Sequence, residues 1–375
     1  MNLLQENLNK KVTQLCFQTK MPSKIAIAIS GGADSVALCF LLQEYCREAK
    51  IELLAVTVDH KIRENSSSEA LNVGALLNKH GISHHILELT NKVPEKNIEA
   101  SLREKRYSLL YDFCLAHEIE FLFLGHQEGD VAENFLIRLF RGSGLDGLSA
   151  IAEISDLKKI KLVRPLLDVK KDDLKEFLKQ KNIAFFEDET NKDEKFLRNK
   201  IRNFLESLPE NDLIQKRIKK SADEISKIRD HFDSDLLREA RYLLRFDKNG
   251  TCYIERNKFS EIDETMALKI LALVLMEVGG KTYKPRFEKL KNFYHYLASE
   301  DIIKPRNFYG CLARLHEDKY LKIEREKAAI DLNRIEKIDN AAFLIDGRLL
   351  IKDLETLPDS IKNAKFHFRT ILKNL

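Results

Sequence analysis

Residues 30–35, Ser-Gly-Gly-Ala-Asp-Ser, combine the residue types that hold a phosphate group. Two adjacent glycines permit a positive φ and remove side chains that would collide with a bound group. The apolar residues 24–29 before them predict a buried β-strand, and residues 34–44 after them predict a helix. Free backbone N–H groups and the positive end of the helix dipole then meet at one point. The segment therefore predicts a phosphate-binding loop, and a tight turn without a ligand is the alternative.

A second segment, residues 125–134, has two acids at the spacing of a magnesium site. Asp130 and Glu133 are three residues apart near the start of an expected helix, so their side chains share one helix face. Magnesium takes a few carboxylate oxygens and completes its shell with phosphate oxygens. The pair therefore indicates a metal beside the phosphate, and acids that only complement the helix dipole are the alternative. His126, just before them, is either a group at the reacting centre or a structural histidine.

Ionisable residues elsewhere in the first 202 residues complete the candidate set. They are Asp59 and His60 after an apolar run, Arg103 and Arg106 on an expected helix, and Arg198 and Arg202 one turn apart on another. Arginine suits phosphate and planar groups because its guanidinium is planar and donates in a fork. A solvated loop for the first pair and an ion-paired helix surface for the second are the alternatives.

The elements that must position these groups are short strands alternating with helices. Five apolar runs fall at residues 24–29, 51–58, 86–89, 121–125 and 161–165. Such alternation predicts an α/β fold with a doubly wound, parallel, five-stranded sheet. Ligands of this fold bind at the carboxyl ends of the strands. The phosphate loop, Asp59 and Asp130 all follow such an end, so we expect them to lie together.

Length and composition limit the class of protein. A chain of 375 residues with 44% apolar and 33% charged residues suits two or three globular domains. No apolar run reaches the 18 to 20 residues of a membrane span, and no signal-peptide core is visible, so we expect a cytoplasmic protein without membrane contact. The six cysteines are widely spread and have no CxxC pairing, which predicts reduced thiols rather than zinc or disulfides.

The motifs taken together resemble one enzyme family, the tRNA(Ile)-lysidine synthetases, which are PP-loop ATP pyrophosphatases of the N-type. In chain order the motifs are SGGADS, VDHKIR, NIEASLREKRY, GHQEGDVAEN, RGSGLDGLSA, RPLL, EDETN and FLRNKIRNFL. The resemblance is close over residues 20–210 and loose beyond them. It implies an adenine nucleotide alpha hydrolase-like fold and ligation of L-lysine to the wobble cytidine of tRNA(Ile) with a CAU anticodon. In that reaction ATP adenylates C2 of the base, and lysine then displaces AMP.

The same resemblance implies roles for individual residues. It implies catalytic roles for Asp34, His126, Asp130, Glu133 and Arg198, and it implies that Asp34 and Asp130 bind Mg²⁺. Contacts with ATP fall to Ser30, Gly31, Gly32, Ala33, Asp34, Ser35, Asp59, His60, Arg103 and Arg106. Two positions depart clearly from the family pattern, since Gly129 replaces a usual aspartate and Asn134 a usual threonine, and Glu189 is a smaller departure where the family often has proline. Asp130 keeps the more informative of the paired acidic positions, so we expect activity to survive.

The chain divides, on this interpretation, into three parts. Residues 1–209 form the PP-loop catalytic domain, residues 210–300 a mostly helical tRNA-binding domain, and residues 301–375 a small α+β module that also serves tRNA. Both a monomer and a homodimer are compatible with the sequence.

Three other functions fit the sequence less well than that of the synthetase. A tRNA thiolase of the same class needs a cysteine pair or an iron–sulfur site, which the isolated cysteines do not offer. An amidotransferase-like synthetase would leave the basic residues 158–202 unexplained and would need a glutaminase segment. A tRNA-binding protein without activity has no need of Asp34, Asp130 and Glu133 together.

Overall fold

The chain folds into two compact units, Met1–Arg229 and Asp230–Leu375, each described here by itself. The computed structural model describes residues 3–16, 21–61, 66–89, 98–186, 197–247, 250–281, 283–299 and 304–326, with only the backbone of 98–100 and of four short strands near the C-terminus. Among these residues, no helix combines the length and the apolar character that crossing a membrane requires.

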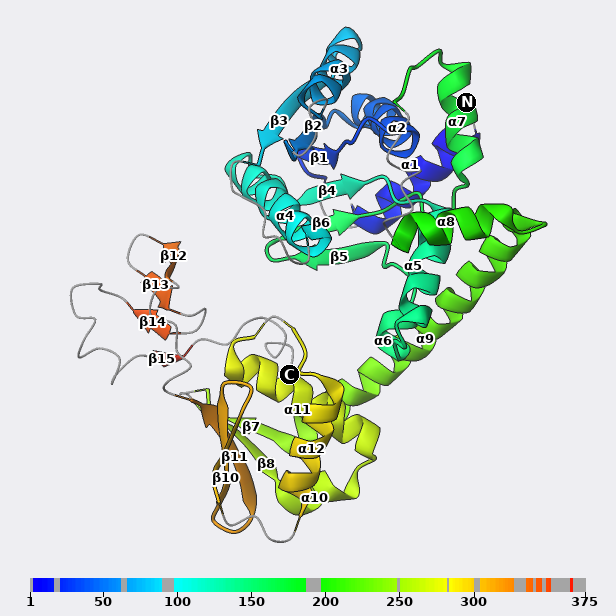
Figure 1. Ribbon diagram of the computed structural model, residues 1–375. Coiled ribbons are helices and arrows are strands. Elements are labelled where there is room, and N and C mark those ends of the chain that lie inside the picture. Colours follow the sequence, from blue (N-terminus) through cyan, green and yellow to red (C-terminus); the bar gives the residue numbers. More distant parts are fainter. Residues whose placement is uncertain are drawn as a thin grey trace. The chain divides into compact units, whose positions relative to one another are not determined.

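The first unit is organised around a six-stranded sheet of order β3-β2-β1-β4-β6-β5 (Figure 1). Its strands are β1 (Lys24–Ala28), β2 (Glu52–Asp59), β3 (Ser83–Glu88), β4 (Phe121–Leu124), β5 (Ile154–Leu157) and β6 (Ile160–Val163). All neighbours pair in parallel except β5, which runs antiparallel to β6 across a turn at Lys158. The expected five-stranded parallel sheet is therefore confirmed, and β5 is a sixth strand at its edge.

Helices cover both faces of this sheet because β1 is buried on both sides. Ile25 and Ile27 belong to a core with α1 (Leu3–Cys16), α2 (Ala33–Ala49), α3 (Ser66–Lys79) and α7 (Lys171–Gln180). Ala26, which points the other way, belongs to a core with α4 (Ile98–Ala116). A strand with two apolar faces thus dictates the doubly wound arrangement.

A helical group continues from the carboxyl end of β4. It consists of α5 (Glu128–Phe140), α6 (Leu145–Leu148), α8 (Leu197–Ser207) and the start of α9 (Asn211–Leu243). Ala132 on α5 packs against Ile201 and Leu205 on α8, with Ile214 of α9 beside them. This packing fixes the face of α5 that carries the acids against α8, which carries the arginines.

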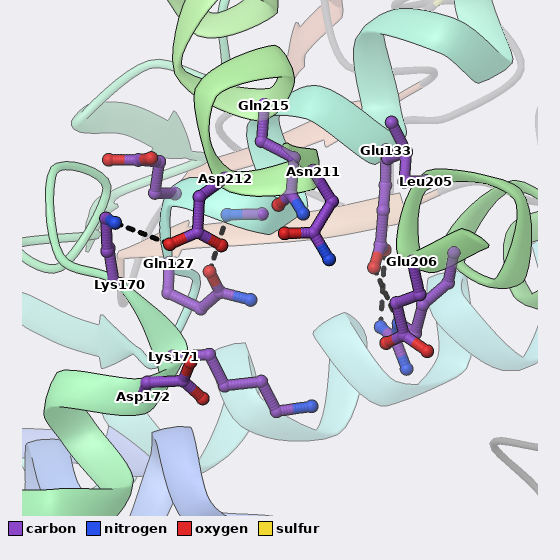
Figure 2. Close-up of a pocket in the computed structure, with 13 residues that line it drawn as sticks. Gln127, Glu133, Lys170, Lys171, Asp172, Leu205, Glu206, Asn211, Asp212 and Gln215 are labelled. Atoms are coloured by element: carbon purple, nitrogen blue, oxygen red, sulfur yellow. Dashed lines mark hydrogen bonds and ion pairs between the residues drawn. The ribbon is translucent and has the colours of Figure 1, made fainter. Parts of the chain in front are cut away.

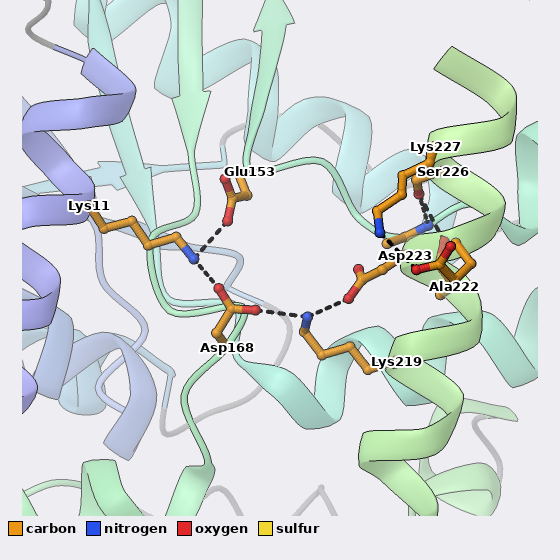
Figure 3. A network of polar contacts seen from close by, with 10 residues as sticks. Lys11, Glu153, Asp168, Lys219, Ala222, Asp223, Ser226 and Lys227 are labelled. Carbon is orange, nitrogen blue, oxygen red and sulfur yellow. Dashed lines mark hydrogen bonds and ion pairs between the residues drawn. The ribbon is translucent and has the colours of Figure 1, made fainter. Parts of the chain in front are cut away.

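A chain of ion pairs joins distant segments of the first unit (Figure 3). Lys11 on α1 binds Glu153 (2.7 Å) and also Asp168 in the segment after β6. Asp168 in turn binds Lys219 on α9 (2.8 Å), and Lys219 binds Asp223 (2.7 Å). Lys219 is largely buried, so this network stabilises more than an isolated surface pair does.

The second unit is α+β, with an antiparallel sheet of order β7-β8-β11-β10-β9. Its elements are β7 (Leu244–Phe246), β8 (Cys252–Glu255), α10 (Arg256–Glu261), α11 (Glu264–Gly279), α12 (Phe287–Ala298), β9 (Arg306–Phe308), β10 (Cys311–His316) and β11 (Tyr320–Arg325). The apolar α11 forms the centre of its core. A separate sheet comprises β12 (Ile335–Asp339), β13 (Ala342–Ile345), β14 (Leu349–Ile351) and β15 (Lys365–Phe366).

The compact units divide the chain differently from the three expected parts. Residues 210–229, expected in a second domain, pack with α5 and α8 in the first unit. The pairing of β8 with β11 joins strands from both sides of residue 300. The tRNA-binding roles of these parts stay predictions.

Candidate active site at the carboxyl ends of the strands

The loop between β1 and α2 has the geometry of an anion site. Gly31 has φ +87°, and a Cβ there would lie 2.8 Å from Val73 Cγ2, so only glycine fits. Its carbonyl accepts a hydrogen bond from the Phe186 N–H (2.9 Å). The first backbone hydrogen bond of α2 runs from Val36 to Gly32 (3.0 Å), so the N–H groups of residues 33–35 have no helical acceptor. These donors and the helix dipole face one point, as the sequence predicts.

Two serines hold the loop in shape. The Ser35 hydroxyl donates to the Gly32 carbonyl (3.0 Å) and accepts from the Ser30 N–H (3.2 Å). The two hydroxyls are 3.2 Å apart. Ser30 and Ser35 therefore organise the loop from within, in addition to any contact with a bound phosphate.

The end of β4 lies directly against this loop. A Cβ on Gly125 would lie 2.9 Å from Ser35 Cα and 3.0 Å from Ser35 N, both backbone atoms. Because glycine has no side chain, the end of β4 can approach the start of α2 closely, and His126 and α5, which follow in the chain, lie near it.

Three carboxylates and two arginines form a single cluster beside the loop. Glu133 accepts from Arg198 Nε (2.7 Å) and from Arg202 Nε (2.6 Å). Arg198 also binds Asp130, so one guanidinium bridges both acids of α5. Asp130 uses its other oxygen to accept from the Gln127 N–H (2.9 Å), which caps α5. The structure thus brings Arg198 to Asp130 and Glu133, from which it is 68 and 65 residues distant in the sequence.

Asp34 is the third carboxylate of this cluster, and no described residue donates a hydrogen bond to its Oδ1 atom, which is buried. Burial, together with the nearby charge of Asp130, raises the pKa of Asp34 to about 6, while the charges of Lys171 and Arg202 oppose that rise. A buried, unpaired carboxylate oxygen beside other acids fits a cation, and oxygen ligands next to phosphate suit Mg²⁺.

His126 and His60 are neutral groups in a cationic environment. Burial lowers the pKa of His126 to about 3, helped by the charges of Arg164 and Arg198. Burial also lowers the pKa of His60, helped by Arg106. The Nδ1 atoms of both rings are buried and have no hydrogen-bond partner among the described residues.

Arg103, Arg106 and Arg164 supply that environment. The two α4 residues stack on Tyr107, with guanidinium carbons 5.0 and 5.3 Å from the ring centroid. Arg164, at the end of β6, begins the RPLL motif, but neither its spacing nor the resemblance predicts a role for it. An arginine directly after a buried apolar run is the signal that points to it.

Asp59 has a structural role in the loop after β2. It accepts hydrogen bonds from the Lys61 N–H (2.9 Å), the Ser66 hydroxyl (2.7 Å) and the Ser67 hydroxyl (2.6 Å). Burial would raise the pKa of Asp59, but these hydrogen bonds and the Lys61 charge lower it. Each of its oxygens thus accepts a hydrogen bond within this loop or from the start of α3. The contact of Asp59 with ATP stays a prediction.

A polar cavity of about 160 Å³ adjoins the acid cluster (Figure 2). Glu133 and Arg202 are among the residues that line it, and so are Asp212 and Lys170, which form an ion pair (2.6 Å). Figure 2 shows the Lys171 side chain extended along the cavity, and this ammonium makes no ion pair with a described residue. The cavity holds both signs of charge and connects with the cluster through Glu133.

The strand–loop–helix phosphate site and the adjoining carboxylates define the class: residues 4–208 match the PP-loop domain family of ATP-binding proteins. The tRNA(Ile)-lysidine synthase of Orientia tsutsugamushi is 33% identical over 81% of this chain and 70% of its own length. That of Ruegeria pomeroyi is 31% identical over 90% and 78%, and that of Rickettsia akari 29% over 94% and 81%. The chain belongs to the tRNA(Ile)-lysidine synthase family, as the motifs predict.

Proposed function

We propose that this chain uses ATP to ligate free L-lysine to C2 of the wobble cytidine of a CAU-anticodon tRNA(Ile). The observation that carries the proposal is the cluster of Asp34, Asp130 and Glu133 beside the phosphate loop, in a chain of this family. The C2 carbonyl oxygen is a poor leaving group until it carries AMP. ATP adenylates it with release of pyrophosphate, and the lysine amine then displaces AMP. The modified base pairs with A instead of G, which changes decoding from AUG to AUA.

The residues around the phosphate loop have different roles in the first step, the adenylation of the cytidine. The N–H groups at the start of α2 bind the departing pyrophosphate, which carries the growing negative charge. Arg198 is held beside the reacting groups by its two carboxylate partners. His126 stays neutral at physiological pH, so it offers a nitrogen to the base without adding a charge. The cytidine reaches this point by unstacking, which costs little in a single-stranded loop.

We assign Mg²⁺ to Asp34 and Asp130. The unpaired Asp34 oxygen and the raised pKa of that group support the assignment. When bound, the ion would neutralise charge on the phosphates during transfer.

We place lysine in the cavity of Figure 2. A site for a free amino acid needs cations for the carboxylate and anions for two ammonium groups. Lys170 and Lys171 supply cations for the carboxylate of lysine, and Glu206 and Asp212 supply anions for its ammonium groups. Because Glu133 borders both the cavity and the cluster, an amine directed toward it lies next to the activated base.

We assign the residues beyond 209 to tRNA docking. Their support is the set of cations stacked on tyrosines in the second unit, namely Lys258 on Tyr242 (4.4 Å) and Arg306 on Tyr296 (4.4 Å). Cations beside an exposed ring, as at Tyr242, suit nucleic acid, and binding should weaken steeply with salt. The reaction then takes place in the cytoplasm, where tRNA, ATP and lysine occur together.

The experiment is incorporation of labelled lysine into a CAU-anticodon tRNA(Ile) transcript, with ATP and Mg²⁺. A methionine tRNA with the same anticodon is the control. Label in the isoleucine tRNA alone supports the proposal. If pyrophosphate is released in the presence of tRNA but no lysine is incorporated, the proposed adenylation step stands, and the proposal that lysine is the nucleophile is refuted.

A further inference from the structure

Tyr107 on α4 lies at the centre of a group of arginines. The guanidinium carbons of Arg103 and Arg106 lie 5.0 and 5.3 Å from its ring centroid, within the range of cation–π attraction. The Tyr107 hydroxyl is buried, lies close to Arg164, and makes no hydrogen bond of good geometry with a described residue. One side chain thus contacts three cations.

Arg164 is the buried member of this group. It is 6% exposed, and one of its NH₂ groups donates to the Ala152 carbonyl (2.8 Å) and the Ser155 hydroxyl (3.0 Å). Its Nε atom is buried and has no described partner. Burying a guanidinium without a carboxylate is costly, and burial accordingly lowers the pKa of Arg164.

The charge of the group is not neutralised within the described residues. Arg198 and Arg202 nearby are paired with Asp130 and Glu133, but Arg103, Arg106 and Arg164 form no ion pair with a described carboxylate. All three act on the buried ring of His126. Three cations that pair with no described carboxylate surround a neutral histidine at the end of β4 and favour binding of an anion there.

We propose that Tyr107 is a positioning residue that holds Arg103 and Arg106 on its ring and, with Arg164, completes a phosphate site beside His126. This rests on the proposed function, which supplies two sources of phosphate, the triphosphate of ATP and the backbone of the anticodon loop. Its residues come from α4 and the end of β6, whereas the pyrophosphate portion of ATP is assigned to the loop at the start of α2.

The test compares Tyr107→Leu with Tyr107→Phe in the full-length protein. Leucine removes the aromatic face, whereas phenylalanine retains it and removes only the hydroxyl. Equilibrium affinities for ATP with Mg²⁺ and for tRNA(Ile) are measured separately, without lysine. We expect Tyr107→Leu to weaken one of them about 3- to 30-fold and Tyr107→Phe to stay within about 2-fold of wild type.

The affected substrate identifies the source of the phosphate. Weakened tRNA binding with unchanged ATP binding assigns the site to the RNA backbone, and the converse assigns it to ATP. Unchanged affinity for both in Tyr107→Leu overturns the proposal. Equal losses in Tyr107→Phe and Tyr107→Leu also overturn it, because the ring face would then not be what positions the arginines.

A double substitution separates positioning from loss of fold. If Tyr107 acts through the arginines, Tyr107→Leu costs no further affinity in an Arg103→Gln, Arg106→Gln background. An undiminished further loss there would mean that leucine disturbs the fold, and it would refute the positioning role. Wild-type lysine incorporation is assayed in parallel, so failure of the proposed function is seen independently of these affinities.

Discussion

Replacing Gly125 with alanine tests how closely β4 must approach the phosphate loop. The added Cβ would lie 2.9 Å from Ser35 Cα, and an ordinary contact begins at 3.4 Å, so one backbone must move by about 0.5 Å. Neither neighbour is a flexible side chain that could turn away. We expect the start of α2 to move relative to His126 and α5, because these are the segments that Gly125 joins.

The size of the effect follows from that displacement. Overpacking of this kind costs about 1–3 kcal/mol of unfolding free energy. For a unit of this size the loss lowers Tm by roughly 2–12 °C. Since a 1 Å misplacement of reacting groups costs about 100-fold in rate, a displacement of about 0.5 Å should cost about 10-fold in kcat/KM. Thermal unfolding and lysine incorporation at varied ATP measure the two effects.

Gly144→Ala is the matched control for stability and ATP affinity. Its φ is −83°, and an added Cβ there meets no atom within 4 Å. We expect its Tm and ATP affinity to remain at the wild-type values. If Gly125→Ala also kept the wild-type Tm and kcat/KM, the close approach would not be what positions the catalytic groups.

Three further predictions concern charged groups. The folded-state pKa of Asp34, about 6, exceeds its ordinary value of 3.8, so ionisation of this carboxyl group destabilises the fold. Without metal, Asp34→Asn should therefore raise Tm at pH 8, and the gain in Tm should shrink as the pH falls from about 6 toward 3.8. Equal Tm values for the variant and the wild type at pH 8 would contradict this prediction. Asp130→Asn keeps an oxygen that accepts from the Gln127 N–H but loses the charge that binds Arg198, so lysine incorporation should fall by about 100-fold or more at nearly wild-type Tm. Asp130→Ala also loses the cap of α5 and should lower the free energy of unfolding by about 1 kcal/mol more. Near-normal turnover by the asparagine variant would refute the catalytic role of Asp130. Lys219→Met should destabilise the protein by about 1 kcal/mol and the exposed Lys227→Met by clearly less. Equal effects of the two substitutions in thermal unfolding would contradict a stabilising role of the network.

The strand ends and the main acids could be predicted from the sequence because local pattern determines them. The apolar run before residue 30 is buried on both faces, and the spacing of Asp130 and Glu133 alone places them on one helix face. The short β5, with Ser155 and Asp156 at its centre, has no such pattern, and its pairing depends on β6 beside it.

Contacts across the chain could not be predicted in the same way. The pairing of Arg198 with Asp130 depends on the packing of α8 on α5 through Ala132 and Ile201. Asp59 follows a strand end as the pattern requires, yet hydroxyls at the start of α3 engage its oxygens. A motif identifies residue types near a site, but the partners of each atom depend on the packing of distant helices.

The ion pair between Lys11 and Asp168 also has a consequence for the order of folding during synthesis. The two residues are 157 positions apart, and the network closes only when Lys219 of α9 has followed. At about 5–20 residues per second, a ribosome takes roughly 10–30 s to add the intervening chain. For that time the first helix has been made but lacks its polar partners, and Leu8 and Val12, which are buried in the folded unit, lack part of their core. The nascent chain therefore offers an apolar helix face to chaperones until most of the first unit has emerged.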